Sequence, residues 1–185
     1  MMIEYFKGIM GAGFDSESVV LEPKLLKFAK GEVLVKAGDT DPVFYFLIKG
    51  IVEVSIPGEK EWIYDFFFPN SVLAAYSSLL TGKPSKITIA AIEDCVVEAY
   101  DWTALQKQYK TSLGANQMGR FITEQIFLLR SKREIDFLSK SAEQRYEELI
   151  QSQPDLILNI PVHRIARYLG IHPESLSRIR KKMNS

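Results

Sequence analysis

The segment LILNIPVHRIARYLGIHPESLSRIRKKMNS, from Leu156 to Ser185, has the strongest local pattern in the chain. Pro161 can open a first helix, and Ile165 and Leu169 recur one helical turn apart on one face of it. Gly170 supplies the backbone freedom that a tight turn needs, and a second helix is expected to start near Pro173. The pattern predicts a helix-turn-helix, an arrangement that reads DNA.

The second helix of this segment is predicted to bury one side and expose the other. Leu176 and Ile179 can pack on the first helix, which leaves Glu174, Ser175, Ser177, Arg178 and Lys181 toward solvent. Residues 161–185 hold six basic side chains and one acidic side chain, although the whole chain is neutral. Such concentrated basicity fits phosphate binding. The alternative is an amphipathic helical hairpin that packs on its own domain or on a protein partner.

Composition indicates a globular protein of one ordinary domain and a small second one. The chain has 185 residues, of which 46% are hydrophobic and 25% charged. It has no apolar run near the roughly 18 residues that span a bilayer and no signal-peptide pattern at its start, so we expect a cytoplasmic protein without membrane contact. The single Cys95 lies in an apolar stretch and is interpreted as a buried structural thiol rather than a redox sensor.

The N-terminal part has short β-rich segments separated by glycine and proline turns. Regular spacing of such segments is typical of an antiparallel barrel or sandwich. The expected strands lie around 27–28, 33–35, 43–48, 51–56, 62–68, 87–91 and 95–99.

The pattern changes to helix after Tyr100. Asp101 can cap a short helix, and a long helix is expected over about 112–138. Its apolar seam is predicted to form a dimer interface, with the contact residues Met118, Phe121, Ile122, Gln125 and Leu129. The alternative is a helix that lies only on its own domain. Residues 136–150 are expected to form the first helix of the C-terminal domain.

The order of these parts resembles the Crp/Fnr family of bacterial transcription regulators. The resemblance rests on FAKGEVLVKAGD (28–39) with FYFLIKGIVEV (44–54), on AAIEDC (90–95), and on Ile165-Ala166, Leu169-Gly170 and ESLSR (174–178). It implies an α+β fold: a cyclic-nucleotide-binding-like jelly roll over 1–110, a dimerisation helix over 111–138 and a helix-turn-helix domain over 139–185. The family usually adds a β-hairpin wing, and because the sequence stops at Ser185 we expect this wing to be reduced or absent.

The resemblance also implies a homodimer that binds a pseudo-palindromic operator in double-stranded DNA, with RNA polymerase as a further candidate partner. By position, Glu174 and Arg178 are the expected base-reading residues, with Ser177 between them. His172, Ser175, Arg180 and Lys181 are assigned to phosphates. The family often has arginine where Pro173 stands, so we expect a different operator.

The predicted sensor pocket departs from the family. Relatives that bind cyclic nucleotides use a Gly-Glu pair and then an arginine followed by serine or threonine. By alignment these positions hold Ser71-Val72 and Ser85-Lys86 here. Without the bidentate arginine a cyclic phosphate loses a charge-assisted clamp, so we do not expect cyclic AMP as effector, although a cyclic-nucleotide-responsive regulator stays an alternative. The candidate pocket residues are Ser71, Val72, Tyr76, Lys83, Ser85, Lys86 and Thr88. The effector is unknown, and no cofactor is predicted.

Enzyme function is not expected. A metal-dependent enzyme on a similar barrel needs several histidines inside it, but His163 and His172 both lie in the C-terminal motif, so no metal site is predicted. A protein-interaction scaffold that has lost DNA binding is the remaining alternative.

Overall fold

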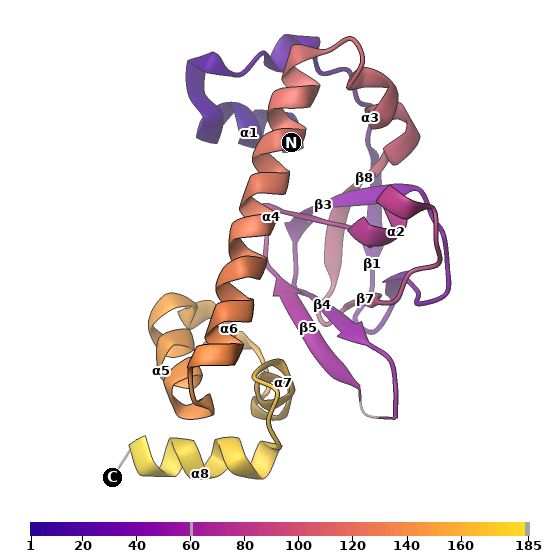
Figure 1. Ribbon diagram of the computed structural model, residues 1–185. Coiled ribbons are helices and arrows are strands. Elements are labelled where there is room, and N and C mark those ends of the chain that lie inside the picture. Colours follow the sequence, from indigo (N-terminus) through magenta and orange to yellow (C-terminus); the bar gives the residue numbers. More distant parts are fainter. Residues whose placement is uncertain (60, 184–185) are drawn as a thin grey trace.

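Two four-stranded sheets form the N-terminal half of the computed structural model, which describes residues 1–59 and 61–183 (Figure 1). All strand pairs are antiparallel, as the turn spacing predicted. The first sheet has the order β1-β8-β3-β6, with β1 (Lys24–Phe28), β8 (Cys95–Asp101), β3 (Val43–Lys49) and β6 (Ser71–Leu73). The second has the order β2-β7-β4-β5, with β2 (Val33–Val35), β7 (Thr88–Ala91), β4 (Val52–Ile56) and β5 (Trp62–Phe67).

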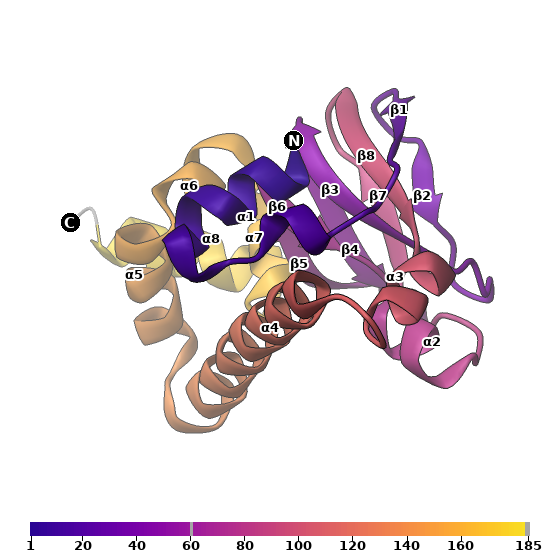
Figure 2. The same cartoon turned by 90° about the horizontal axis from the view of Figure 1, so that it is seen from above.

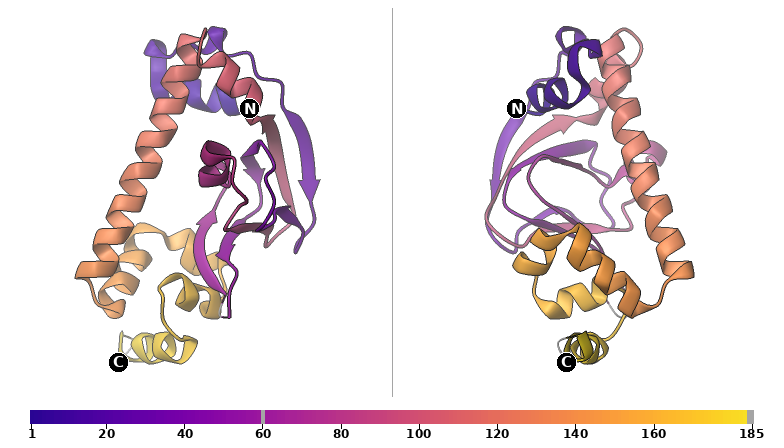
Figure 3. Two further views of the ribbon diagram at one scale, coloured as in Figure 1. Left: turned by 45° about the vertical axis from the view of Figure 1, so that its right-hand side comes forward. Right: turned by 90° about the vertical axis from the view of Figure 1, so that its left-hand side faces the viewer.

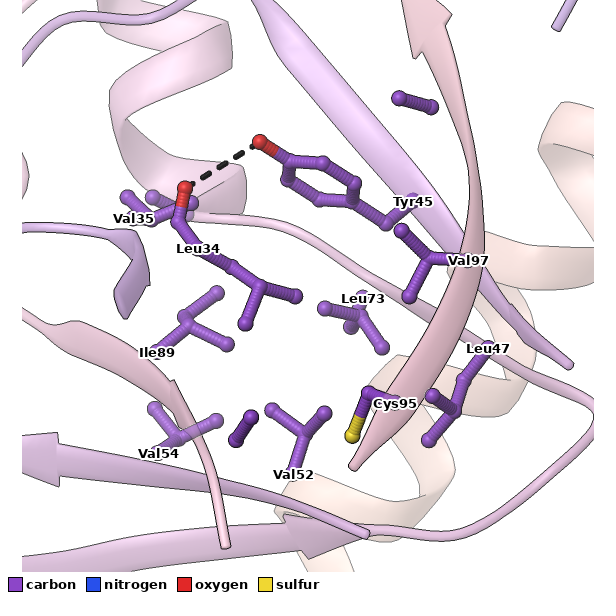
Figure 4. Close-up of a cluster of buried hydrophobic side chains, with 13 residues drawn as sticks. Leu34, Val35, Tyr45, Leu47, Val52, Val54, Leu73, Ile89, Cys95 and Val97 are labelled. Carbon is purple, nitrogen blue, oxygen red and sulfur yellow. Dashed lines mark hydrogen bonds between the residues drawn. The ribbon is translucent and has the colours of Figure 1, made fainter. Parts of the chain in front are cut away.

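Apolar side chains from both sheets fill the interior of this roll (Figure 4). Leu47, Val52, Ile89 and Val97 are each fully buried there. The hydroxyl of Tyr45 donates a hydrogen bond to the backbone carbonyl of Leu34 at 3.2 Å. Cys95 belongs to the same cluster and burial raises the pKa of its thiol, so the prediction of a buried thiol is confirmed.

Helices flank the roll and continue the chain beyond it. They are α1 (Met2–Met10), α2 (Tyr76–Thr81), α3 (Trp102–Gln108), α4 (Leu113–Ser139), α5 (Ala142–Ser152), α6 (Pro154–Asn159), α7 (Val162–Tyr168) and α8 (Pro173–Met183), with short 3₁₀ turns η1 (Gly11–Gly13) and η2 (Ser16–Ser18). Figure 2 shows α2 and α3 beside each other at one side of the roll. None of the helices within the described ranges is both long and apolar enough to cross a membrane. The prediction about a wing concerns the chain beyond Met183 and lies outside the described residues.

The predicted boundary between the long helix and the C-terminal helices was wrong by several residues. Residues 136–139 belong to α4, and α5 starts only at Ala142. Ser141 caps α5 by accepting from the backbone N–H of Gln144, while the Gln144 side chain accepts from the N–H of Ser141. This reciprocal capping box fixes the start of α5. The elements β6, α1, α2 and α6 were not predicted, since each is short or lacks a clear period.

The first turn of α4 is held against the segment around Asp15. The N–H of Gly114 donates to Ser18 Oγ at 2.9 Å, and the Gln117 side chain accepts from Asp15 N at 2.9 Å and donates to Gly13 O at 2.8 Å. A Cβ on Gly114 would lie 1.9 Å from the carbonyl oxygen of Asp15. This glycine therefore permits the close approach from which α4 runs along the roll (Figure 1).

Gly114→Ala should lower the free energy of unfolding by about 1–3 kcal/mol, because backbone must move to admit the methyl group. Thermal and urea unfolding measure the change. Gly8→Ala is the matched control. Gly8 lies within α1 with no atom within 4 Å of an added Cβ, so alanine there should raise the free energy of unfolding by about 0.5–1 kcal/mol. Equal stability changes in the two variants would contradict the close contact.

Candidate nucleic-acid interface

The C-terminal segment forms the predicted pair of helices. Pro161 is the N-cap of α7, and α8 begins at Pro173. Gly170 in the turn has a φ of +73°, which favours glycine, and the N–H of Ile171 donates to the carbonyl of Ala166 at 3.0 Å. An added Cβ on Gly170 would also lie 2.9 Å from the ring of Phe137 on α4. Both the turn and its contact with α4 therefore depend on this glycine.

A shared apolar core fixes the angle between α7 and α8. Leu176 on α8 is fully buried, and Ile165, Ala166 and Leu169 on α7 are nearly so. They pack with Tyr146 and Leu149 of α5 and with residues of the roll, Ile51, Ile63 and Phe66. The expected burial of Leu176 and of the Ile165 and Leu169 face is confirmed.

The outer side of α8 collects the predicted DNA-contacting residues. Glu174, Ser177 and Arg178 are exposed, as are His172, Arg180 and Lys181, while Ser175 is partly buried. In the side views α8 lies beyond α7 at the end of the molecule opposite α1 (Figure 3). The polar face of α8 is thus presented at one end of the molecule.

Two basic residues of α7 bind the roll. Arg164 forms an ion pair with Glu53, a buried residue of β4, and Arg167 Nη1 lies 3.0 Å from Glu61 Oε2. Lys182 pairs with Glu143 of α5 at 2.9 Å. Part of the positive charge that the sequence concentrates at this end therefore fixes α7 and α8 to their neighbours.

Aromatic and guanidinium groups complete the junction between roll, α4 and α7. The ring of Tyr168 lies 5.7 Å from that of Phe66, measured between centroids. The guanidinium carbon of Arg133 lies 4.0 Å above the Tyr168 ring, and Arg133 donates to the Tyr168 carbonyl at 2.9 Å. Stacking of this kind stabilises a cation and a ring together. The junction thus connects α4 directly to the helix-turn-helix.

A network of ion pairs connects the C-terminal end of α4 to α5. Lys132 Nζ lies 2.6 Å from Asp136 Oδ2 and 2.8 Å from Glu148 Oε1, and Lys140 contacts both carboxylates. Hydrogen bonds from the two lysines lower the pKa of Asp136 and of Glu148. Both carboxylates therefore stay charged at neutral pH, which holds α5 beside the end of α4.

The predicted dimer residues lie mostly on the side of α4 that faces its own chain. Met118 is fully buried, and Phe121 and Ile122 pack against the same cluster beneath α1. Gln125 is exposed, and Leu129 lies at the rim of a cavity. Met118 is therefore engaged within its own chain, and Phe121 and Ile122 are so in part, because α4 is apolar on two sides and periodicity does not say which side meets the roll.

The other side of α4 is an exposed apolar face. Its residues are Phe127, Leu128, Ile135 and Leu138, with exposed fractions from 59% to 83%. Leu128 and Ile135 are seven residues apart and Leu138 comes three residues later, the spacing of a coiled-coil seam. This spacing was present in the sequence and could have identified the face.

The predicted effector residues do not gather around one space. Val72 and Tyr76 line a cavity of about 350 Å³ under α4, while Ser71 lines a second cavity of about 280 Å³ at the junction. Lys83, Ser85, Lys86 and Thr88 line neither cavity. Ser85 is buried and donates to the carbonyl of Ile87, and Thr88 accepts from the N–H of Ala37. These hydroxyls therefore serve the local backbone.

Comparison with known proteins identifies the fold. Residues 25–112 match the family model of the cyclic nucleotide-binding domain. FixK2 from Bradyrhizobium japonicum superimposes with a TM-score of 0.75 at 18% identity, over 89% of this chain and 85% of FixK2. The chain has the Crp/Fnr fold.

Two further Crp/Fnr-type structures align over nearly the whole chain. A Crp/Fnr-family regulator from Eubacterium rectale gives a TM-score of 0.71 at 14% identity, covering 98% of this chain and 88% of its own. The regulator CLP from Xanthomonas campestris, described as c-di-GMP responsive, gives a TM-score of 0.70 at 15% identity. The alignment covers 99% of this chain and 90% of CLP. No curated protein sequence matches the chain. The Crp/Fnr resemblance and the α+β fold predicted from sequence are thereby confirmed.

Removal of Arg164 should weaken the attachment of α7 to the Crp/Fnr roll, because the buried Glu53 carboxylate would lose its ion-pair partner. We expect Arg164→Ala to cost about 1–3 kcal/mol in unfolding free energy, and Arg164→Ala combined with Glu53→Gln to recover part of it. Arg167→Ala is the control on the same helix, since both members of its pair are 43% or more exposed and its loss should cost less than about 1 kcal/mol. Equal losses in the two single variants would show that Glu53 does not require its partner.

Proposed function

We propose that this chain is a sequence-specific regulator of transcription that binds double-stranded DNA as a homodimer. The observation that carries the proposal is the outer face of α8, where Glu174, Ser177 and Arg178 are exposed. Leu176, on the opposite side of the same helix, is fully buried and holds α8 in place. A helix presented in this way fits the major groove. The proposed division of the chain is a sensor roll over 1–110, a dimerisation helix over 111–138 and a DNA-binding domain over 139–185.

Base reading is assigned to Glu174, Ser177 and Arg178. A glutamate accepts from cytosine N4, and an arginine donates two hydrogen bonds to guanine. His172, Ser175, Arg180 and Lys181 are assigned to phosphates, which set position without reading sequence. We infer a pseudo-palindromic operator, whose half-sites lie about 34–36 Å apart if each copy places α8 in one groove.

The dimer contact is assigned to the exposed face of α4, comprising Phe127, Leu128, Ile135 and Leu138. Exposed apolar side chains that gather in a row on one helix face mark a surface that another protein covers. The row is self-complementary in a parallel helix pair, so a second copy of the chain fits it. Leu129 and Gln125 stay candidates for the edge of this contact, and RNA polymerase stays a candidate partner of the DNA-bound dimer.

DNA selection from a randomised duplex library tests the function directly. We expect one enriched palindromic motif, with Arg178→Ala weakening binding to it by about 1–3 kcal/mol and relaxing the preference at one position of each half-site. Arg180→Ala should weaken all duplexes alike and reduce the slope of log affinity against log salt by about 0.9 for each phosphate that is no longer neutralised. Arg120→Ala removes an exposed arginine at the far end of α4 and serves as control. Absence of any enriched duplex would favour a protein-interaction scaffold.

Leu128→Asp should disrupt the dimer. Burying a leucine contributes about 1.5–3 kcal/mol, so placing a carboxylate there should raise the dimer dissociation constant more than about tenfold. Sedimentation equilibrium measures it. Leu158→Asp, at an 80% exposed position of α6, is the matched control. A dimer that survives Leu128→Asp and Ile135→Asp would place the contact elsewhere.

A further inference from the structure

The cavity under α4 is a space that the proposed DNA function does not use. It has a volume of about 350 Å³, near the low end of the roughly 300–1,000 Å³ of small-molecule pockets. Its walls come from β3, β5, β6, α2, α3 and α4, so six elements contribute to it. Only a small molecule fits such a volume.

The cavity lies on the opposite side of β6 from the interior of the roll. Leu73 and Ala75 belong to the core between the sheets, whereas Val72 and Ala74 line the cavity under α4. Alternate residues of an extended segment point to opposite faces, which explains this division. Two of the predicted effector residues, Val72 and Tyr76, line this cavity, whereas Ser85 and Thr88 do not, and the interior of the roll is filled (Figure 4).

The lining is apolar and rich in rings. Tyr64, Phe67, Trp102 and Tyr109 all contribute, together with aliphatic residues such as Ile126. The Tyr76 and Trp102 rings meet edge to face at 6.0 Å, as do those of Trp102 and Tyr109 at 6.4 Å. Such walls favour a ligand with a flat apolar ring.

The charges at the cavity neutralise one another. Arg130 is the one Lys, Arg or His among the described residues that line it. Its guanidinium lies 2.8 Å from Asp65 Oδ2 and stacks 4.2 Å above the ring of Tyr64. A cyclic phosphate would have to displace Asp65 to reach this arginine and would leave a buried carboxylate unpaired, which is costly. The cavity therefore favours an uncharged ligand.

Hydroxyl groups give the cavity a limited hydrogen-bonding capacity. Burial raises the pKa of Tyr109 to about 12, so its hydroxyl is neutral at physiological pH and can donate. The hydroxyls of Tyr76 and Thr123 lie 3.2 Å apart at the α4 wall. One polar atom on a ligand is enough to pair with them.

Helix α4 of a second copy of the chain is not expected to fill this cavity. The cavity wall on α4 is made by Ile122, Ile126 and Arg130, which recur every four residues on one side. The exposed row with Leu128 and Ile135 lies on the other side of the helix. A dimer formed through that row leaves the cavity to a small molecule.

We propose that this cavity binds a small uncharged molecule with an apolar ring-bearing body and one hydrogen-bonding group. The role of this molecule as an effector rests on the proposed DNA-binding function. Its binding to the cavity does not depend on that function.

Titration of the full chain with N-phenyl-1-naphthylamine, an uncharged fluorescent ring compound, tests the site without DNA. We expect saturable binding of about one molecule per chain at micromolar concentration. 8-Anilino-1-naphthalenesulfonate has the same aromatic framework with a sulfonate, and it should bind at least about tenfold more weakly. Cyclic AMP should not compete. Tighter binding of the sulfonate, or competition by cyclic AMP, would overturn the inference of an uncharged ligand.

Ala74→Phe fills the cavity and should reduce probe affinity at least about tenfold, while Ala29→Phe, an exposed site between β1 and β2, should leave it unchanged. Thr123→Phe closes the cavity from the α4 wall and replaces Ala74→Phe if that variant does not fold, as judged by circular dichroism. Unaltered binding in a folded cavity variant would refute the site. Since DNA selection is measured separately, failure of either proposal does not affect the other.

Discussion

The close contact between Gly114 and the backbone at Asp15 is the constraint on which the rest of the structure depends. It sets where α4 starts, and α4 then supplies one wall of the cavity, the exposed apolar row and the residues that contact α7. Met118 and Ala115 bury the first turns against the roll, while Arg133 and Phe137 near the other end contact Tyr168 and Gly170. A single helix therefore connects the roll to the helix-turn-helix.

The sequence predicts the structure best where local geometry alone determines it. In the helix-turn-helix, Ile165 and Leu169 are one turn apart, Gly170 needs positive φ, and Leu176 must be buried if α8 is to pack, so few arrangements are possible. The cap at Asp101 is similarly local, and its carboxylate accepts from the N–H groups of Thr103 and Ala104. The alternation of strands and turns predicted the roll for the same reason.

The sequence predicts the partner of a side chain less well where the residue has two plausible partners. Met118 and Leu128 are both apolar residues of one helix, and only the packed structure shows that the first meets its own roll and the second meets solvent. Arg164 and Arg167 belong to the basic charge that the sequence concentrates at the C-terminal end, but their carboxylate partners Glu53 and Glu61 are about a hundred residues away. Likewise, the walls of the cavity under α4 come from six elements, so no single motif could indicate it.

The length of α4 has a mechanical consequence. Its 27 residues rise about 1.5 Å each, so the helix is roughly 40 Å long, and its close backbone contact at Gly114 lies near one end. Such a helix is a lever arm: a tilt of a few degrees at the cavity is negligible near Gly114 but becomes a displacement of ångströms at Phe137. An added Cβ on Gly170 would lie 2.9 Å from the Phe137 ring, so a displacement of Phe137 would act directly on the turn between α7 and α8. In this geometry, a small change of volume at the cavity would change the orientation of the helix-turn-helix.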